Sequence, residues 1–373
     1  MLKRALFDNL KNLRGWRSNR KLLVLSVDDY ACVRLESPEA LGALQRAGVK
    51  PVNRFDRFDA FETTTDLEAL FGVLGRHVDS KGRHPVISAY AVAANPDFDR
   101  TLEEHRYVPE PVSTTIQRLE TDDPEHYEGL AEKWEEGMER GLLNPQFHGR
   151  EHFNVDTLNA LLATGNPDLL VNLQHRSMSG VRVPSELAAA SVYVAFPAGK
   201  ENRLTEQAGI IAEGFELFSQ VFGQSPTCFA PPSLQLDPSL YSACSQLGLG
   251  GIDLPFLQDR DQSPAWPKVN VLGQQRDDEH VTIVRNVVFE PGHDAARDWV
   301  GEAIKQIAVA FRWGKPANIS SHRVNFAGRI DEQNRAGGLN ALDDLLARVL
   351  RRWPDVEFIG SDALVDVVMA DRQ

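Results

Sequence analysis

Residues 237–255, DPSLYSACSQLGLGGIDLP, hold a complete helix-to-strand unit in one short stretch. Asp237 is a typical helix N-cap, Pro238 suits the first helical position, and Gly248 can end the helix. The apolar residues that follow predict a short strand that leads to Asp253. This is the unit from which sheets of parallel strands covered by helices are built.

The same alternation of strand-like and helix-like segments runs from residue 21 to the end of the chain. Repeated strand–helix units favour a parallel sheet with helices outside it. Short apolar runs without polar alternation are typical of strands that are covered on both faces. They predict strands at 21–27, 84–94, 167–173 and 316–322, and a strand that runs into a helix at 356–368.

We therefore expect an α/β fold: an irregular (β/α) barrel of parallel strands, in one large domain over residues 21–373. An open doubly wound sheet is the alternative, although no GxGxxG or P-loop motif marks a phosphate site. The charged stretch at about 95–143 breaks the alternation and has a helical pattern over 124–141. We expect it to be a helical insertion between two barrel strands near the mouth of the site. A solvated peripheral position is the alternative.

Composition places the chain among globular proteins and excludes some classes. It has 373 residues, of which 42% are hydrophobic and 25% charged, with a formal net charge of -13. A general nucleic-acid binder needs clustered Lys and Arg, so no nucleic acid is expected as a partner. No apolar run reaches the ~18 residues of a membrane-spanning helix. Cys32, Cys228 and Cys244 lack metal-site spacing, which favours free thiols in a reducing, cytoplasmic compartment.

Residues 1–20 form a basic amphipathic segment. Leu2, Leu6, Leu10 and Leu13 fall on one face of a predicted helix. A secretory signal needs a continuous apolar core of ~7–15 residues, which this segment lacks. Two interpretations stay open: the helix docks on the body of the protein, or it lies on an anionic membrane surface. In the second case the protein is peripheral to the inner face of the membrane.

Two groups of residues suggest a metal site. His148 and His152 lie four positions apart in NPQFHGREHFNV, residues 144–155. If this segment is helical, both imidazoles face one side and can reach one ion, and a carboxylate would complete three ligands. Asp28 and Asp29 end an apolar strand, where charges must be paired or solvated. A capping turn explains one aspartate; two suggest one carboxylate on a metal and one that moves protons.

Two further strand ends could complete the site. His322 ends the strand in ANISSHRVNF, and its ordinary pKa near neutrality suits a general acid. Pro231 and Pro232, in TCFAPPSLQLDP, stiffen a loop after another strand and can shape a substrate site.

Taken in order, these motifs resemble those of the polysaccharide deacetylase superfamily, metal-dependent deacylases on an irregular (β/α) barrel. The resemblance rests on the acidic pair, the two histidines separated by three residues, the APPS stretch and the late histidine. It implies that Asp29, His148 and His152 hold a divalent metal, commonly Zn²⁺. It also implies that Asp28 is the general base and that His322 donates a proton to the leaving nitrogen.

The sequence departs from the family pattern at two positions. Tyr30 stands where the family usually has a glycine, and Ala230 stands where it has an arginine that steadies the catalytic aspartate. Arg150, Arg285 or Arg323 could take the place of that arginine. We predict four substrate contacts: Tyr30, Arg150, Pro232 and Arg323.

The resemblance implies a hydrolase that acts on C–N bonds and deacetylates an N-acylated sugar or a related amide. A glycoside hydrolase on the same barrel is one alternative. It needs two carboxylates ~5–9.5 Å apart, for which Asp28 with Asp253 or Glu151 could be proposed. A catalytically inactive carbohydrate-binding protein of a glycan-assembly system is the other alternative, which Ala230 favours.

Overall fold

The structure is a computed structural model that describes residues 2–187, 191–197, 201–258, 268–274, 280–294 and 296–371. Within these residues, nine strands form one sheet in which every pair is parallel. The strands are β1 (Lys21–Tyr30), β2 (Ile87–Ala91), β5 (Leu143–Phe147), β6 (Cys228–Phe229), β7 (Gly251–Asp253), β10 (Val281–Ile283), β11 (Val287–Val288), β12 (Ala317–His322) and β13 (Val356–Phe358).

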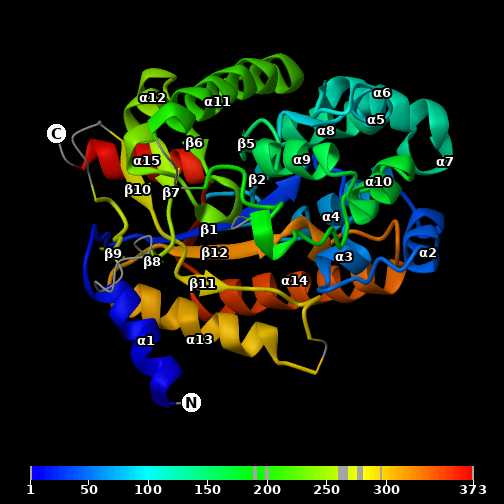
Figure 1. Cartoon of the computed structure of the whole chain (residues 1–373). Helices are drawn as coiled ribbons and strands as arrows, with labels where there is room; N and C mark the ends of the chain where they lie inside the picture. The colour runs from blue at the N-terminus through cyan, green and yellow to red at the C-terminus, as the bar shows by residue number, and fades with distance from the viewer. Residues whose placement is uncertain are drawn as a thin grey trace.

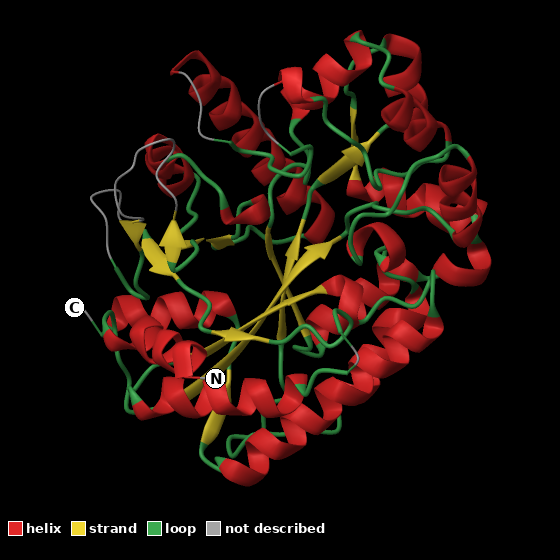
Figure 2. Ribbon diagram, turned by 60° about the horizontal axis from the view of Figure 1, so that its bottom comes forward, coloured by secondary structure: helices red, strands yellow, loops and turns green. Residues whose placement is uncertain are grey.

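The sheet curls around β1 and is covered by helices (Figures 1 and 2). Its order is β10-β7-β6-β5-β2-β1-β12-β11, and β13 pairs with β1 beside this path. No ladder joins β10 to β11 in the described part of the chain, so the barrel is open there. The prediction of an α/β fold with an irregular barrel of parallel strands in a single domain is confirmed.

Helices connect the strands, and short turns and two small antiparallel pairs complete the framework. The helices of the barrel are α2 (Pro38–Arg46), α3 (Phe55–Phe58), α4 (Thr64–Leu74), α9 (Val155–Ala163), α10 (Pro167–Gln174), α11 (Glu201–Phe222), α12 (Tyr241–Gln246), α13 (Trp299–Arg312), α14 (Glu332–Arg352) and α15 (Ser361–Ala370). The 3-10 turns are η1 (Ser185–Leu187), η2 (Pro232–Leu234), η3 (Pro238–Leu240) and η4 (Arg323–Asn325). The antiparallel pairs are β3 (Ala94–Pro96) with β4 (Pro109–Pro111) and β8 (Leu257–Gln258) with β9 (Lys268–Val269).

The stretch 237–255 folds as its sequence predicts. The Asp237 side chain accepts a hydrogen bond from the Ser239 backbone N–H, with Pro238 at the first helical position. The helix passes from η3 into α12 and ends before Gly248, whose φ of 90° suits a residue without Cβ. Strand β7 then ends at Asp253.

The prediction of a strand at 167–173 is wrong, because this segment is helix α10. The Asn166 side chain caps it by accepting a hydrogen bond from the Leu169 N–H, and Pro167 occupies the first turn. Leu169 and Leu173 are buried at helical spacing. In a run of this length, strand and helix cannot be told apart by periodicity, and the capping residue decides.

The predicted helical insertion lies between β2 and β5. It contains α5 (Phe98–Glu104), α6 (Val112–Asp122), α7 (Pro124–Tyr127) and α8 (Leu130–Glu139). Gly129, with a φ of 71°, separates α7 from α8 within the segment predicted as one helix. Trp134 of α8 is buried and packs edge-on against Tyr30 at 5.6 Å between ring centroids. The insertion is therefore part of the hydrophobic core rather than a solvated periphery.

The core lies on both faces of β1, whose residues Leu22, Leu23 and Val24 are at most 1% exposed. Full burial of such a side chain stabilises the fold by about 1.5–3 kcal/mol. The three cysteines are buried free thiols, as predicted.

Helix α1 (Leu2–Leu13) docks on the body through its asparagines. Asn9 accepts hydrogen bonds from Arg312 at 2.7 Å and from Trp313 at 3.0 Å, and Asn12 accepts one from Asn286 at 2.8 Å. Among the described helices, none has the length and apolar character to cross a bilayer.

Helix α14 approaches the turn after β12 closely at one glycine. A Cβ at Gly338 would lie 1.7 Å from the Asn325 carbonyl oxygen. The neighbouring Gly337 has open space around its Cβ position. The approach fixes Asn325, which donates hydrogen bonds to Glu290, Ser321 and the His322 carbonyl.

We expect Gly338→Ala to lower the free energy of unfolding by about 3 kcal/mol or more, because the methyl group must displace a backbone oxygen. Gly337→Ala is the matched control, and it should be neutral or stabilise the fold by up to about 1 kcal/mol through helix propensity. Urea unfolding followed by circular dichroism measures both. Equal effects of the two substitutions would contradict the close approach.

Candidate active site

Strand β1 ends in an irregular turn that carries both aspartates. The register between β1 and β2 shifts between Val27 and Tyr30. Asp29 has a φ of 73° and Ala31 a φ of 60°, so the backbone twice enters the left-handed region. Aspartate tolerates this region better than most residues, whereas alanine adopts it at a cost. The turn holds two buried carboxylates at one end of the barrel.

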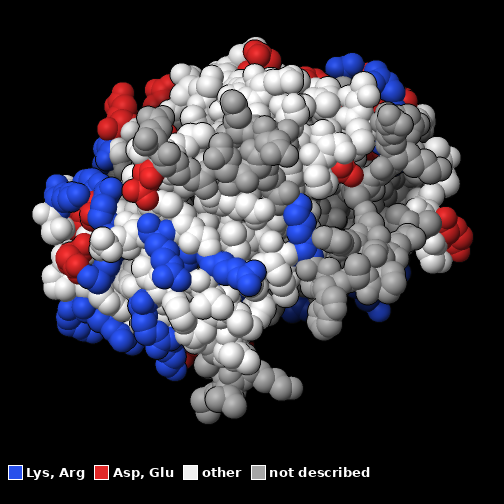
Figure 3. Space-filling model, turned by 90° about the vertical axis from the view of Figure 1, so that its left-hand side faces the viewer, with Lys and Arg blue, Asp and Glu red and all other residues white. Residues whose placement is uncertain are grey.

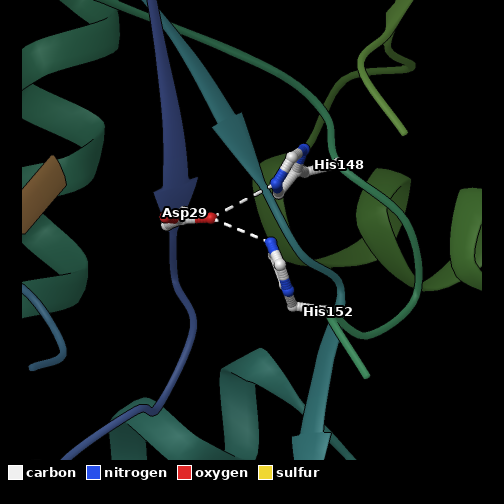
Figure 4. Close-up of side chains that lie close together, drawn as sticks. All are labelled: Asp29, His148 and His152. Carbon is white, nitrogen blue, oxygen red and sulfur yellow. Dashed lines mark ion pairs between the residues drawn. The ribbon is translucent and has the colours of Figure 1, made fainter. Parts of the chain in front are cut away.

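Asp29 lies against both predicted histidine ligands, as Figure 4 shows. Its Oδ1 is 3.1 Å from His152 Nε2 and 3.4 Å from His148 Nε2. One ligand atom of each residue lies within 4.8 Å of the others. The structure therefore brings together three groups, more than 100 residues apart in sequence at their widest, that the sequence assigned to one ion.

The segment between the two histidines is a loop, so the helical alignment considered from their spacing does not apply. His148 directly follows β5, and Gly149 turns the chain with a φ of 103°. A Cβ at Gly149 would lie tightly, at 3.3 Å, against both the Glu151 carbonyl oxygen and the Phe196 ring. The end of β5 and the turn at Gly149 bring the two imidazoles together.

The state of His148 fits a metal ligand. Its Nδ1 is 2.6 Å from the Ala230 carbonyl oxygen, which can only accept, so Nδ1 carries the proton. Nε2 then presents a lone pair; it is buried and has no hydrogen-bond partner. Metal-bound histidines are commonly oriented in this way by a carbonyl behind the ring. Two imidazole nitrogens and one carboxylate oxygen are a donor set typical of Zn²⁺.

The electrostatics of Asp29 agree with this arrangement. Burial raises the pKa of Asp29, but His152, His148 and His322 outweigh it and hold that pKa well below its usual range. Burial lowers the pKa of His152 despite the Asp29 charge beside it. An ionised Asp29 beside a neutral His152 is the protonation state that suits a cation.

Asp28 is held on the other side by Arg285. The guanidinium donates to both Asp28 oxygens at 2.6 and 2.7 Å, and its Nε donates to Asp253 at 2.6 Å. Asp253 is fully buried, and burial raises its pKa to about 6 despite Arg285. Of the three arginines considered as replacements for the one missing at Ala230, Arg285 is the one bound to Asp28.

His322 approaches the same carboxylate from β12. Asp28 and His322 are register partners, and His322 Nε2 lies 3.9 Å from Asp28 Oδ2. Its Nδ1 is 2.6 Å from Glu290 Oε1, and Arg54 and Asn325 hold the second oxygen of Glu290. Burial lowers the pKa of His322, but Glu290, Asp29 and Asp28 outweigh it and raise that pKa to about 9. The imidazole is therefore protonated at neutral pH.

The four predicted substrate contacts lie in different surroundings. Tyr30 and Arg323 are each 1% exposed; Arg323 is paired with Asp59 and Glu62, both at 2.8 Å. Arg150 is paired with two glutamates, Glu151 and Glu213. Pro232 is buried beside Gly149. Contact of these side chains with substrate stays a prediction.

Sequence reasoning missed Glu290 altogether and left Arg285 as one of three arginines. Both follow short apolar strands: Arg285 lies two residues after β10, and Glu290 two residues after β11. Polar residues at the carboxyl ends of parallel strands are the signal that singled out Asp28 and His322. The same rule, applied to these short strands, would have found the other two.

No protein-family model matches the chain, and no curated protein is similar to it in sequence. Solved structures with a similar fold include a candidate polysaccharide deacetylase from Mycobacterium smegmatis. It has 13% identity and a TM-score of 0.47, over 96% of this chain and 94% of that one. A GH57-type branching enzyme from Pyrococcus horikoshii has 9% identity and a TM-score of 0.48 over 93% and 70%. An allantoinase has 9% identity and a TM-score of 0.46 over 95% and 92%.

These similarities are similarities of fold. At identities of 7–13%, the assignment of chemistry rests on the side chains of this chain.

Glu290→Gln should lower the pKa of His322, because it removes the carboxylate that most strongly raises it. In the wild type the folded pKa of about 9 lies above the ordinary value of 6.5. The stability gained from this pair is therefore complete below pH ~6.5 and is lost as the pH rises through ~9. In the variant that loss moves to lower pH. NMR titration of the His322 imidazole measures the shift, with Glu332→Gln, at an exposed glutamate of α14, as the control. An unchanged titration would show that Glu290 does not set this pKa.

Proposed function

We propose that this protein is a metal-dependent hydrolase that removes the acyl group from an N-acylated sugar or a related amide. The proposal is carried by one observation: the buried donor set of Asp29, His148 and His152, with the Nε2 of His148 free of any hydrogen-bond partner. A carboxylate and a protonated imidazole flank this set, which are the two proton-transfer groups that amide hydrolysis requires.

Each residue around Asp29, His148 and His152 has a separate role in the proposed hydrolysis. A divalent ion held by Asp29, His148 and His152, most simply Zn²⁺, would polarise the substrate carbonyl and lower the pKa of a bound water to about 7. Asp28 accepts the proton of the attacking water, and Arg285 fixes its carboxylate in place. As the water oxygen adds to the carbonyl carbon and the C–N bond breaks, His322 gives its Nε2 proton to the leaving nitrogen. Glu290 holds the ring through Nδ1 and keeps it charged. The products are an amine and a carboxylic acid.

The arrangement disfavours the two alternative functions. A glycoside hydrolase needs a second accessible carboxylate, but Asp253 and Glu151 are at most 1% exposed and are bound to Arg285 and Arg150. An inactive protein was favoured by the missing arginine, and Arg285 supplies an equivalent guanidinium to Asp28.

Asp28→Asn should keep the metal but lower the rate of acyl release by about 10²–10⁴-fold, the usual contribution of a general base. His152→Ala should lose both metal and activity. Acetate release from N-acetylated sugars, with the zinc content of each purified variant, tests this. Asp344→Asn, at an exposed ion pair of α14, is the matched control.

Two results would count against the proposal. If Asp28→Asn turned over substrate at the normal rate, the assignment of Asp28 as the general base would be wrong. New reducing ends without acetate would indicate glycoside hydrolysis instead.

A further inference from the structure

Arg34 is a nearly buried guanidinium without a hydrogen-bond acceptor. The residue is 8% exposed, its Nε is buried without a partner, and its side chain makes no ion pair within the described residues. It lies over the ring of Tyr193, at 3.9 Å from the centroid, and near the ring of Phe55 at 5.6 Å. Arginine is almost never buried unless it is paired, so folding alone does not explain this side chain.

Arg34 lies beside the candidate active site. Phe55 contacts Arg34 and also packs edge-on against His322, at 5.0 Å between ring centroids. Through Phe55, the guanidinium is therefore packed next to the proposed acid.

The nearby acids already have partners. Asp59 accepts from Arg323 at 2.8 Å, and Asp56 accepts from backbone N–H groups. Neither of these acids accepts a hydrogen bond from Arg34, and a cation bound to Asp29 would offset the charge of that third nearby acid. A buried guanidinium whose donors lack an acceptor is suited to an anion.

We propose that Arg34 binds a carboxylate of the substrate, so that the preferred substrates are N-acylated sugars or related amides that also carry an acidic group. The planar guanidinium matches a carboxylate in bidentate geometry. The rings of Tyr193 and Phe55 hold the guanidinium by cation–π contacts at 3.9 and 5.6 Å from their centroids. This inference rests on the proposed function, whose reacting amide it places next to the acidic group.

The test compares N-acetylmuramic acid with its neutral methyl ester as substrates of the zinc-loaded protein. For the wild type we expect a KM at least about 10-fold lower for the acid, as one charge-assisted contact provides. In Arg34→Met the two KM values should be equal, with kcat less affected. Arg46→Met, at an exposed arginine of α2, should behave as wild type. N-acetylglucosamine 6-phosphate, used in parallel, distinguishes a phosphate site from a carboxylate site. Equal KM values for acid and ester in the wild type would overturn the inference.

A binding measurement separates this inference from the proposed function. If no acetate is released from any substrate, calorimetric titration of the zinc-loaded wild type with the acid and the ester still tests Arg34. Binding of the acid that is at least about 10-fold tighter than that of the ester, and is lost in Arg34→Met, would support the anion site although the proposed hydrolysis fails. Equal affinities for the acid and the ester would also overturn the proposal that Arg34 binds an anion.

Helix α1 supports a second inference, because its amphipathic faces are inverted. Its asparagines Asn9 and Asn12 face the body of the protein, whereas the leucines that follow Ala5 face outward. Leu6, Leu10 and Leu13 are 61%, 48% and 42% exposed. A helix that only docked on the core would bury this apolar stripe.

The surroundings of the stripe extend it and add positive charge. Leu257 of β8 and Val269 of β9 are register partners and are 42% and 49% exposed. The contact of Phe7 with Phe256, at 5.6 Å, holds this pair of strands beside α1. Figure 3 shows Lys and Arg gathered on this side of a protein whose net charge is -13. The basic residues of α1 and of the segment after it include Lys11, Arg14 and Arg17.

We infer that this face lies on a membrane surface that contains anionic lipids. Exposed leucines enter the headgroup region, and nearby Lys and Arg meet lipid phosphates.

The test is flotation with vesicles of phosphatidylcholine alone or with 30% phosphatidylglycerol. We expect binding to the anionic vesicles only, weakened by high salt and reduced at least 10-fold in the triple variant Leu6→Ser, Leu10→Ser and Leu13→Ser. Val52→Ser, at an exposed valine elsewhere, is the control. Absence of binding, or a dimer in solution that the triple variant abolishes, would overturn the membrane assignment.

Discussion

The parallel pairing of β1 with β12 and β2 is the constraint on which the site depends. Asp28 is in register with His322, and the Ala91 carbonyl at the end of β2 accepts from the His148 N–H that follows β5. A slip of one residue along β1 would turn its aspartates away from these partners, because side chains alternate between faces. The apolar residues of β1 are buried on both faces, so the strand that carries the aspartates is also the centre of the core. Folding and the site are thus specified by the same pairing.

The buried carboxylates of the site differ in the positive charge that each has beside it. Asp28 and Asp253 share Arg285, and Glu290 has both Arg54 and a charged His322. Such charges are tolerated in the interior because each has a hydrogen-bonded counter-charge. Asp29 differs, because its close partners are imidazoles rather than arginine or lysine. A divalent ion among these three side chains would supply the missing positive charge.

The sequence predicted the architecture from its strand–helix alternation, and most site residues from charge at the ends of apolar strands. It could not separate α10 from a strand, since eight apolar-rich residues fit both and the cap at Asn166 decided. It grouped His148 and His152 by their spacing, but it could not show that a glycine turn brings them together in space. It could not choose Arg285 over Arg150 and Arg323, since the choice depends on which strand ends meet across the barrel. The pairing of Glu290 with His322 likewise exists only in three dimensions.

The central claim is that Asp29, His148 and His152 bind one divalent cation, and an anomalous-difference map at the zinc absorption edge tests it most directly. Crystals grown with zinc should show a single strong peak about 2.0–2.2 Å from one oxygen of Asp29 and from the Nε2 atoms of both histidines. Density for zinc elsewhere on the chain, with these three side chains hydrogen-bonded to one another and no peak between them, would contradict the account.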